Sequence, residues 1–401
     1  MQRAPKGLRR QIAIMGRCNT GKSTLLNRIA GQEAAMVADT PGTTGDPVPL
    51  SFELLPLGPV TFFDTAGLDE TGPLGEPRRQ ASLAVLERAD MAVLVTDGEG
   101  LGPLERQLID SVRGLATPFL LVFNKQGEKA VSRDDLEECR EKGIPFVCLE
   151  DGRNAEAAPL REALLDLAPA LETETPLLLD LVPEGGMVLL IVPIDVGAPK
   201  GRIGVPQGQV LRELLDGRRL AMTVQDTELD AALASLTRPP DLVVTDSQVV
   251  RTVAAALPET IPLTTFSLLF SRFKGDFALQ AEGARAIANL APGSRILVAE
   301  ACSHHPQPDD IGRVKIPKLL ERHLGFGLEV GTSAGRDFPA DLAEYSLVLH
   351  CGGCMLNRRE MRRRLALCRE AGVPVTNYGM AISAAQGLLE RVTAPFSRAG
   401  S

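Results

Sequence analysis

Short apolar runs alternate with segments of helical periodicity over the first 170 residues of the chain. Four runs are almost continuously apolar, as is typical of parallel strands covered on both faces, and they span 12–15, 60–64, 91–96 and 119–124. Apolar positions three and four residues apart predict helices at 22–30, 80–88, 103–114 and 133–142. This alternation predicts a doubly wound α/β domain with a mostly parallel sheet.

Charged residues, Pro and Gly interrupt the pattern at 168–186, as is typical of a linker. The middle section that follows has predicted strands at 188–192 and 242–245 and predicted helices at 209–216 and 229–234. A third section begins near Asp276, with strands at 296–299, 346–349 and 373–376 and a helical pattern from 380. We therefore predict three α/β domains, with the bounds 1–170, 180–274 and 275–396.

Length and composition agree with a multidomain globular protein. At 401 residues, of which 44% are apolar and 23% charged, two or three domains are expected. The net charge of −8 and the absence of Trp argue against a nucleic-acid partner. No secretory signal pattern opens the sequence and no apolar segment reaches the roughly 20 residues that span a bilayer. The sequence predicts a cytoplasmic protein with no membrane partner.

A phosphate-binding loop runs from Gly16 to Ser23 and matches G-x-x-x-x-G-K-[ST] between a predicted strand and a predicted helix. Backbone N–H groups of such a loop surround phosphates, and the helix N-terminus adds positive potential. We expect Lys22 to reach the β- and γ-phosphates and Ser23 to bind Mg²⁺. The full set of nucleotide-binding residues expected in this loop is Gly16, Asn19, Thr20, Gly21, Lys22, Ser23 and Thr24.

Two further segments follow predicted strands of the same sheet. Asp64-Thr-Ala-Gly67 places a carboxylate where Mg²⁺ is held through water, and a glycine whose backbone approaches the γ-phosphate. Asn124 and Lys125 stand where guanine-specific enzymes carry N-K-x-D, but Gly127 replaces the carboxylate that binds guanine. We expect GTP to be preferred over ATP by less than the usual margin, because a lost buried polar pair costs about 1–3 kcal/mol of discrimination.

Together these motifs resemble a small GTPase domain, and more narrowly its TrmE/Era branch. That resemblance rests on Asn19 and on Thr43-Thr44 after Pro41-Gly42. It implies a K⁺ ion bound with the help of Asn19 and a Mg²⁺-contacting threonine, Thr44, with Thr43 as the alternative. Leu68 stands where Ras-like enzymes carry a water-positioning glutamine. The catalytic set that we expect is Lys22, Thr44, Asp64 and Gly67.

Cysteine and histidine gather in two short segments near the C-terminal end of the sequence. Cys302-Ser-His304-His305 and His350-Cys351-Gly-Gly-Cys354 hold three of the seven cysteines and three of the four histidines. Thiolate and imidazole ligands select iron–sulfur clusters or zinc. Each segment follows a predicted strand, so the two could meet at the carboxyl edge of one sheet. A 4Fe–4S cluster on three thiolates, a Cys₃His zinc site and unligated cysteines all remain open at this stage.

The surroundings of this site leave further alternatives. His304 or His350 is either the fourth ligand or a neighbour of the ligands, and a carboxylate of Asp309 or Asp310 is another candidate. The dense basic run 358–364 is interpreted as a solvated helix face, with a docking surface for an anionic cluster precursor or an acidic partner as the sharper hypothesis. Cys139, Cys148 and Cys368 lack metal-binding spacing and are expected to be packed or surface thiols. Cys18, inside the phosphate-binding loop, is interpreted as a small side chain facing the interior or solvent, with a redox sensor as the alternative.

Over nearly its full length the sequence resembles the FeFe-hydrogenase maturation GTPases of the HydF family. The resemblance rests on the GTPase motifs, on the segments 193–202 and 266–276, and on the C-terminal Cys-x-His…His-Cys-x-x-Cys pattern. It implies a GTPase domain, a dimerisation domain and a cluster domain, in a homodimer or tetramer. It also implies a 4Fe–4S cluster on Cys302, Cys351 and Cys354 with an exchangeable fourth position.

The function implied by the resemblance is that of a scaffold and carrier. The family takes a di-iron precursor made with the radical-SAM maturases HydE and HydG and delivers it to apo FeFe-hydrogenase. Two rival readings remain. One is a TrmE/Era-type GTPase of tRNA or ribosome maturation with a structural zinc site, and the other is an iron–sulfur binding module whose nucleotide site has decayed.

Overall fold

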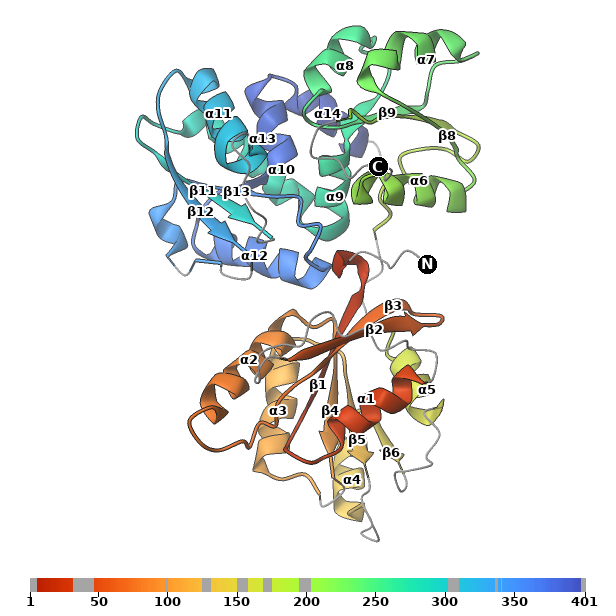
Figure 1. Ribbon diagram of the computed structural model, residues 1–401, viewed down its shortest axis with the longest axis vertical. Coiled ribbons are helices and arrows are strands. Elements are labelled where there is room, and N and C mark those ends of the chain that lie inside the picture. The colour runs from red at the N-terminus through yellow and green to blue at the C-terminus, as the bar shows by residue number, and fades with distance from the viewer. Residues whose placement is uncertain are drawn as a thin grey trace. The chain divides into compact units, whose positions relative to one another are not determined.

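The computed structural model describes residues 6–31, 47–97, 100–124, 131–149, 158–168, 175–194, 203–301, 310–335, 338–339 and 341–397. They belong to two compact units, Met1–Thr173 and Glu174–Ser401 (Figure 1). The first unit ends close to the predicted end of the first domain. The division of the rest into 180–274 and 275–396 stays a prediction.

The first unit is built on one six-stranded sheet with the order β2-β3-β1-β4-β5-β6, in which only the β2–β3 pair is antiparallel. Its strands are β1 (Arg10–Gly16), β2 (Val48–Leu54), β3 (Gly58–Asp64), β4 (Met91–Thr96), β5 (Phe119–Asn124) and β6 (Phe146–Leu149). Its helices are α1 (Lys22–Ala30), α2 (Gly75–Arg88), α3 (Pro103–Gly114), α4 (Arg133–Glu141) and α5 (Ala158–Asp166). The predicted doubly wound, mostly parallel sheet is confirmed.

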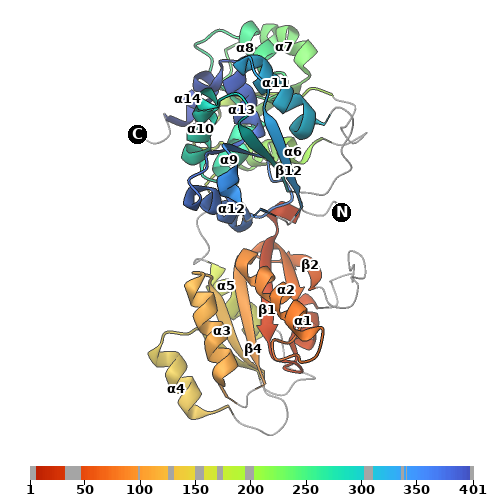
Figure 2. The ribbon, with the colours of Figure 1, turned by 90° about the vertical axis from the view of Figure 1, so that its left-hand side faces the viewer.

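Helices cover both faces of this sheet (Figures 1 and 2). On one face α2, α3 and α4 pack in a core that includes Val85, Leu108 and Cys139. On the other face α1 and α5 pack in a second core with Leu25 and Leu160. Because both faces are covered, β4 and β5 are buried along their whole length, which explains their continuous apolar sequences.

The second unit contains two four-stranded sheets, and every strand pair in them is parallel. The first sheet has the order β10-β9-β7-β8, from β7 (Met187–Ile191), β8 (Leu220–Val224), β9 (Leu242–Thr245) and β10 (Leu263–Thr265). The second has the order β12-β11-β13-β14, from β11 (Arg295–Glu300), β12 (Glu329–Ala334), β13 (Leu347–His350) and β14 (Val375–Asn377).

The helices of the second unit lie between these strands and after the last of them. They are α6 (Val205–Asp216), α7 (Leu229–Ser235), α8 (Val250–Ala256), α9 (Phe266–Lys274), α10 (Phe277–Arg285), α11 (Ile316–Leu324), α12 (Arg358–Glu370), α13 (Tyr378–Ala385) and α14 (Leu389–Ser397). None of the helices in the described parts of the chain combines the length and apolarity needed to cross a bilayer.

One apolar core joins the two sheets of the second unit. It contains Leu189 and Val243 from the first sheet together with Val298 and Leu349 from the second. The segment predicted as a linker is also part of this unit in its later portion, because Leu178 is fully buried beside α6 and α9. The linker prediction for 168–186 is therefore wrong from about residue 177, where the apolar residues pack rather than face solvent.

The shared core predicts that the second unit unfolds as one cooperative body, separate from the first. Leu189→Ala and Leu349→Ala each remove a fully buried side chain, and each is expected to cost about 2–5 kcal/mol. In differential scanning calorimetry both substitutions should lower the same one of two transitions.

Leu121→Ala, in the core of the first unit, is the matched control and should lower the other transition. If Leu189→Ala and Leu349→Ala lowered two different calorimetric transitions, this would contradict the cooperative unfolding of the second unit.

Candidate functional site

The phosphate-binding loop lies where the sequence predicts it, between the end of β1 and the start of α1. The ammonium group of Lys22 is buried and donates to the main-chain oxygens of Gly16 (3.3 Å) and Arg17 (2.5 Å). Burial lowers the pKa of Lys22, and the negative charge of Asp64 opposes that shift. A buried cation with only carbonyl partners is suited to an incoming anion.

Ser23 and Asp64 come together at the end of β3. The Ser23 hydroxyl donates to Asp64 Oδ2 at 2.5 Å, and Asp64 Oδ1 is buried without a hydrogen-bond partner in the described part of the chain. An unpaired carboxylate oxygen beside a serine hydroxyl is the oxygen donor set that Mg²⁺ prefers. These residues therefore fit the predicted Mg²⁺ site.

Asn124, at the end of β5, supports the phosphate-binding loop. It is buried, and its Nδ2 donates to the main-chain oxygen of Thr20 at 2.8 Å. Thr20 is buried as well, and its hydroxyl donates to Arg17 O. Thr24 is exposed on the first turn of α1, and Asn19 adopts a left-handed backbone conformation with φ of 61°. The other predicted nucleotide-binding residues lie outside the described residues: Thr43, Thr44 and Lys125.

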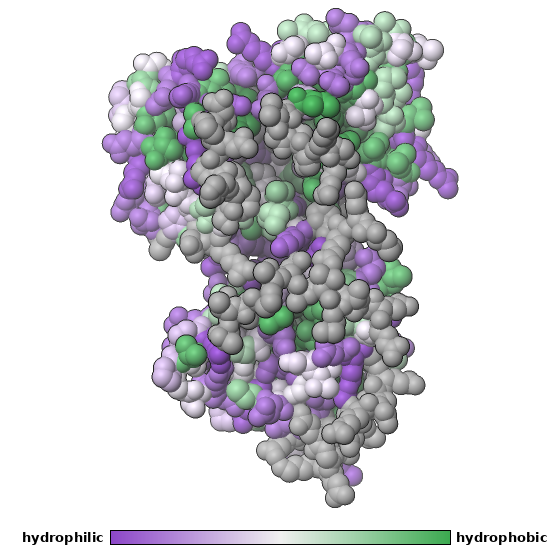
Figure 3. Space-filling model, viewed as in Figure 1, coloured by the Kyte–Doolittle hydropathy of each residue, from purple (hydrophilic) through white to green (hydrophobic). Residues whose placement is uncertain are grey.

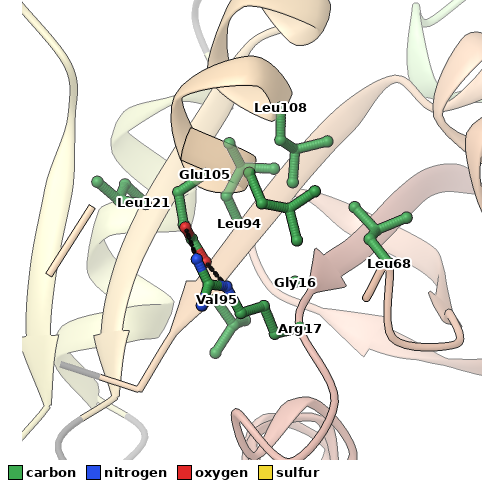
Figure 4. Close-up of a pocket in the computed structure, with 9 residues that line it drawn as sticks. Gly16, Arg17, Leu68, Leu94, Val95, Glu105, Leu108 and Leu121 are labelled. Atoms are coloured by element: carbon green, nitrogen blue, oxygen red, sulfur yellow. Dashed lines mark hydrogen bonds and ion pairs between the residues drawn. The ribbon is translucent and has the colours of Figure 1, made fainter. Parts of the chain in front are cut away.

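The segment after Asp64 packs directly on the loop. A side chain at position 67 would collide with Cys18, so this position requires glycine. Leu68 donates its N–H to Gly16 O at 3.2 Å, and its side chain is buried. Figure 4 shows Leu68 beside a small pocket that Leu94 and Leu108 also line, with the Arg17 guanidinium paired to Glu105. An apolar Leu68 facing this pocket agrees with the expectation that it orients no water.

Asp69 was not singled out by the sequence, yet its carboxylate contacts the loop. The Cys18 N–H donates to Asp69 Oδ1 at 2.6 Å. The pKa of Asp69 is lowered: its partial burial acts to raise it, and the hydrogen bonds from Cys18 outweigh that effect. An anionic oxygen on an N–H of a phosphate-binding loop takes the kind of position that a phosphate oxygen occupies.

The second candidate site lies at the carboxyl edge of the sheet formed by β11 and β13. These strands pair in parallel, with Ala299 opposite His350. Cys351 therefore directly follows the strand, and its N–H donates to Ala299 O at 2.9 Å. In return, the Ala301 N–H points at Cys351 Sγ at 3.1 Å. Residue 301 is thus held against Cys351, although Cys302 and His304 themselves lie outside the described residues.

His350 is completely buried behind Cys351. Its Nδ1 lies 2.7 Å from Cys351 O, and its Nε2 lies 3.4 Å from a nitrogen of Arg364. Burial lowers the pKa of His350 to about 4, so the ring is neutral and its Nδ1–H donates to the carbonyl. With both ring nitrogens occupied, His350 fits the role of a neighbour that orients the cysteine segment better than that of a ligand.

Arg364 differs from the solvated helix face predicted for the run 358–364. Its side chain is fully buried, pairs with Glu360 at 3.0 Å, donates to Gly335 O and lies over the Phe338 ring. The prediction is wrong for this residue, because α12 packs the face that carries Met361, Arg364 and Leu365 onto the second sheet. Arg364 is a structural support for His350.

Two more buried polar groups of the second unit were missed by the sequence. Lys274 is buried at the end of α9 and donates to the oxygens of Gly353 (3.1 Å) and Leu356 (2.9 Å). The Tyr378 hydroxyl is buried with no hydrogen-bond partner in the described parts of the second unit. Burial raises the pKa of Tyr378, and the Cys351 thiolate raises it further. A signal for Lys274 existed: it falls four residues after Phe270 on the apolar face of its helix.

The residues present fit an anionic sulfur-bound group. Cys351 and Cys354 form no disulfide, a backbone N–H donates to Cys351 Sγ, and a buried ammonium holds the main chain next to Cys354. Within the described ranges, which omit 302–309, no three metal-binding side chains come together. Cys139 and Cys368 are buried, whereas Cys18 and Cys148 are exposed, as expected of packed and surface thiols.

Comparison with protein families decides the relationship of the chain. Residues 177–275 match the hydrogen maturase F dimerization domain, and residues 278–395 match the hydrogen maturase F tetramerization domain. Residues 11–125 match a family described as 50S ribosome-binding GTPase. The chain belongs to the hydrogen maturase F family. Its first domain is a GTPase domain, and the family's dimerization and tetramerization domains support self-association.

Curated relatives of the GTPase domain are GTPases named Der. Der of Rhizobium etli is 42% identical over 118 residues, which are 28% of this chain and 24% of that protein. Der of Clostridium tetani is 37% identical over 137 residues, 33% of this chain and 31% of that protein. The chain thus spans about a quarter to a third of the length of these relatives.

Solved structures with similarity to the chain include Era of Aquifex aeolicus bound to GDP and AlF₄⁻. It is 20% identical, with a TM-score of 0.33, and the match covers 54% of this chain and 91% of that one. The G domain of the FeoB iron transporter of T. maritima is 21% identical, with a TM-score of 0.30, and the match covers 40% of this chain and 98% of that one.

The contact of Asp69 with the loop yields a prediction about nucleotide binding. Asp69→Asn removes a carboxylate that competes with the terminal phosphate for the Cys18 N–H, so affinity for GTP should rise about three- to tenfold. Affinity for GMP, which carries no such phosphate, should not change. Titration with fluorescent nucleotide analogues measures both.

Glu70→Gln is the control, since Glu70 pairs with Arg78 rather than with the loop. Equal increases in affinity for GTP and GMP in Asp69→Asn, or a lower affinity for GTP, would contradict competition between Asp69 and the terminal phosphate.

Proposed function

We propose that the chain is a GTP-hydrolysing scaffold and carrier that binds a 4Fe–4S cluster and delivers a di-iron precursor to apo FeFe-hydrogenase. The observation that carries the proposal is the pairing of Cys351 with the end of β11, in a chain that also holds a phosphate-binding loop. Membership in the hydrogen maturase F family supports it.

In the GTPase domain, Lys22 exchanges its carbonyl partners for phosphate oxygens when GTP binds. Ser23 and Asp64 hold Mg²⁺, with Thr44 or Thr43 as the further ligand, and the metal neutralises phosphate charge when bound. The N–H of Gly67 approaches the γ-phosphate. Asn19 would help to hold K⁺, which assists hydrolysis when bound, and the Leu68 side chain would not position the attacking water.

Nucleotide choice depends on the end of β5. Asn124 is already held in place by Thr20, which favours the guanine-binding geometry of that strand end. Lys125 covers the base, and Gly127 lacks the carboxylate that would pair with guanine. We propose GTP as the substrate, with discrimination against ATP weaker than in enzymes that keep this carboxylate.

In the second unit, Cys302, Cys351 and Cys354 hold the cluster, and one iron keeps an exchangeable position. His304 remains the candidate fourth ligand from the first segment. His350 acts as a neighbour, because Cys351 O and Arg364 already occupy its ring nitrogens. A 4Fe–4S cluster, when bound, offers this open position for attachment of a precursor, which is the feature a carrier needs.

Self-association is proposed to use the edge of the first sheet in the second unit. Strand β8 lies at the edge of its sheet. Apolar residues are exposed just before α6, on α6 and on β8: Ile203, Val205, Leu215 and Leu220. Figure 3 shows hydrophobic side chains among hydrophilic ones on the surface of this unit. An unpaired edge with apolar neighbours suits a homodimer, which the tetramerization domain extends to a tetramer.

The partners follow from this carrier role. We propose that the chain receives the precursor with the help of the maturases HydE and HydG and passes it to the hydrogenase apoprotein in the cytoplasm. GTP hydrolysis in the first unit then governs association with these partners rather than the chemistry of the precursor.

Anaerobic reconstitution with iron and sulfide tests the proposal. Wild-type protein should turn brown and give the EPR signal of a reduced 4Fe–4S cluster. Each of Cys302→Ala, Cys351→Ala and Cys354→Ala should lose most of that signal, because two thiolates do not retain the cluster. Cys148→Ala, an exposed cysteine of the first unit, is the matched control and should keep it.

A colourless protein that holds one zinc ion per chain would contradict the proposed carrier function. It would favour the alternative of a GTPase of tRNA or ribosome maturation with a structural zinc site. GTP turnover should be faster in K⁺ than in Na⁺, and no turnover in either salt would favour the decayed nucleotide site. Activation of apo-hydrogenase by protein produced together with HydE and HydG measures delivery.

A further inference from the structure

Helix α9 carries a lysine on its buried face. The face consists of Phe266, Leu269, Phe270 and Lys274, which pack against the first sheet of the unit and against α12. Only 2% of Lys274 is exposed, so its ammonium has lost nearly all contact with water. Such burial is costly unless hydrogen bonds and an opposite charge compensate it.

The hydrogen bonds of this ammonium hold the cysteine turn at two points. Lys274 Nζ donates to Gly353 O (3.1 Å) and Leu356 O (2.9 Å), which lie on either side of Cys354. The turn between them is closed by the Leu356 N–H donating to Gly353 O at 3.0 Å. Gly353 has a φ of 59°, a left-handed backbone conformation that favours glycine, and a side chain there would also meet the end of the Met361 side chain.

The candidates for the opposite charge are the cysteines of the turn. No carboxylate pairs with Lys274 among the ion pairs of the described residues. Burial lowers the pKa of Lys274 to about 8, and the thiolates of Cys354 and Cys351 are the charges that oppose this effect. The ammonium therefore lies against the turn that carries Cys354, with main-chain oxygens on both sides of that cysteine as its hydrogen-bond partners.

We propose that Lys274 is a positioning residue of the cluster site, which fixes the turn that carries Cys354 and serves as the counter-cation of the thiolate-bound cluster. The inference rests on the proposed function, since it takes Cys351 and Cys354 as ligands. It gives a role to Lys274, which lies in the last part of the segment 266–276. This segment is separate in sequence from the Cys-x-His and His-Cys-x-x-Cys segments. Through Lys274, the helix that ends the dimerization-domain match reaches the ligand turn of the tetramerization-domain match.

A fixed cation next to the cluster changes its redox balance. Reduction adds one negative charge, which a nearby ammonium stabilises, so Lys274 makes the cluster easier to reduce. Because the ammonium is buried, salt screens this effect little. A side chain that merely fills space would leave the reduction potential unchanged.

The test compares Lys274→Gln and Lys274→Met with wild type and with Lys318→Gln, which removes an exposed lysine from the same unit. EPR-monitored redox titration of the reconstituted proteins should show a more negative potential in both Lys274 variants and no shift in Lys318→Gln. The difference should persist in high salt. An unchanged reduction potential in a folded Lys274 variant would overturn the proposal that Lys274 is the counter-cation of the cluster.

A second measurement needs no cluster and covers the case in which Lys274→Met does not fold. In the metal-free protein, loss of the two hydrogen bonds in Lys274→Gln should speed hydrogen exchange of the Leu356 amide about tenfold, with GTPase turnover unchanged. Equal exchange in the two proteins would refute the positioning role. If wild type takes up no cluster, the proposed function fails, while this exchange experiment still decides whether Lys274 holds the turn.

Discussion

The parallel pairing of β11 with β13 is the constraint on which the second site depends. With Ala299 opposite His350, the Cys351 N–H donates to Ala299 O and the Ala301 N–H donates to Cys351 Sγ. A shift of one residue would reverse the side-chain direction along β13 and remove Cys351 from this edge. The register is held by a shared apolar core and by His350 and Arg364 behind the strand. Ligand geometry thus follows from sheet packing, and a short cysteine turn can stay accessible without losing its position.

Buried cations recur at both sites and serve the same physical purpose. Lys22 and Lys274 each lie in the interior with main-chain oxygens as hydrogen-bond partners and anions as their expected counter-charges. The cost of removing an ammonium from water makes each position favourable only while the surrounding chain holds it. Both lysines therefore favour the binding of a negatively charged group. In one unit this group is phosphate, and in the other we propose a thiolate-bound cluster. Arg364 differs, because Glu360 neutralises it within the fold.

Most of the GTPase unit was predictable from sequence, since continuous apolar strands and a phosphate loop are local signals. The predicted helix at 80–88 begins at Gly75 in the structure, and β2 was missed because its residues are only half buried. In the second unit the strands before both cysteine segments were predicted, and the structure pairs them in parallel, whereas the meeting of the two segments themselves stays a prediction. The contacts of Asp69 with Cys18, of Lys274 with Gly353 and of Arg364 with Gly335 were not predictable, because each of them joins residues far apart in the sequence. A charged residue on an apolar helix face was the one available signal.

The most direct test of the central claim is the position of iron in crystals of anaerobically reconstituted protein. Anomalous diffraction at the iron edge should place one four-iron cluster at the carboxyl edge of β11 and β13, bonded to the sulfurs of Cys302, Cys351 and Cys354. Anomalous density that excludes Cys302, or a single zinc ion in its place, would contradict the account.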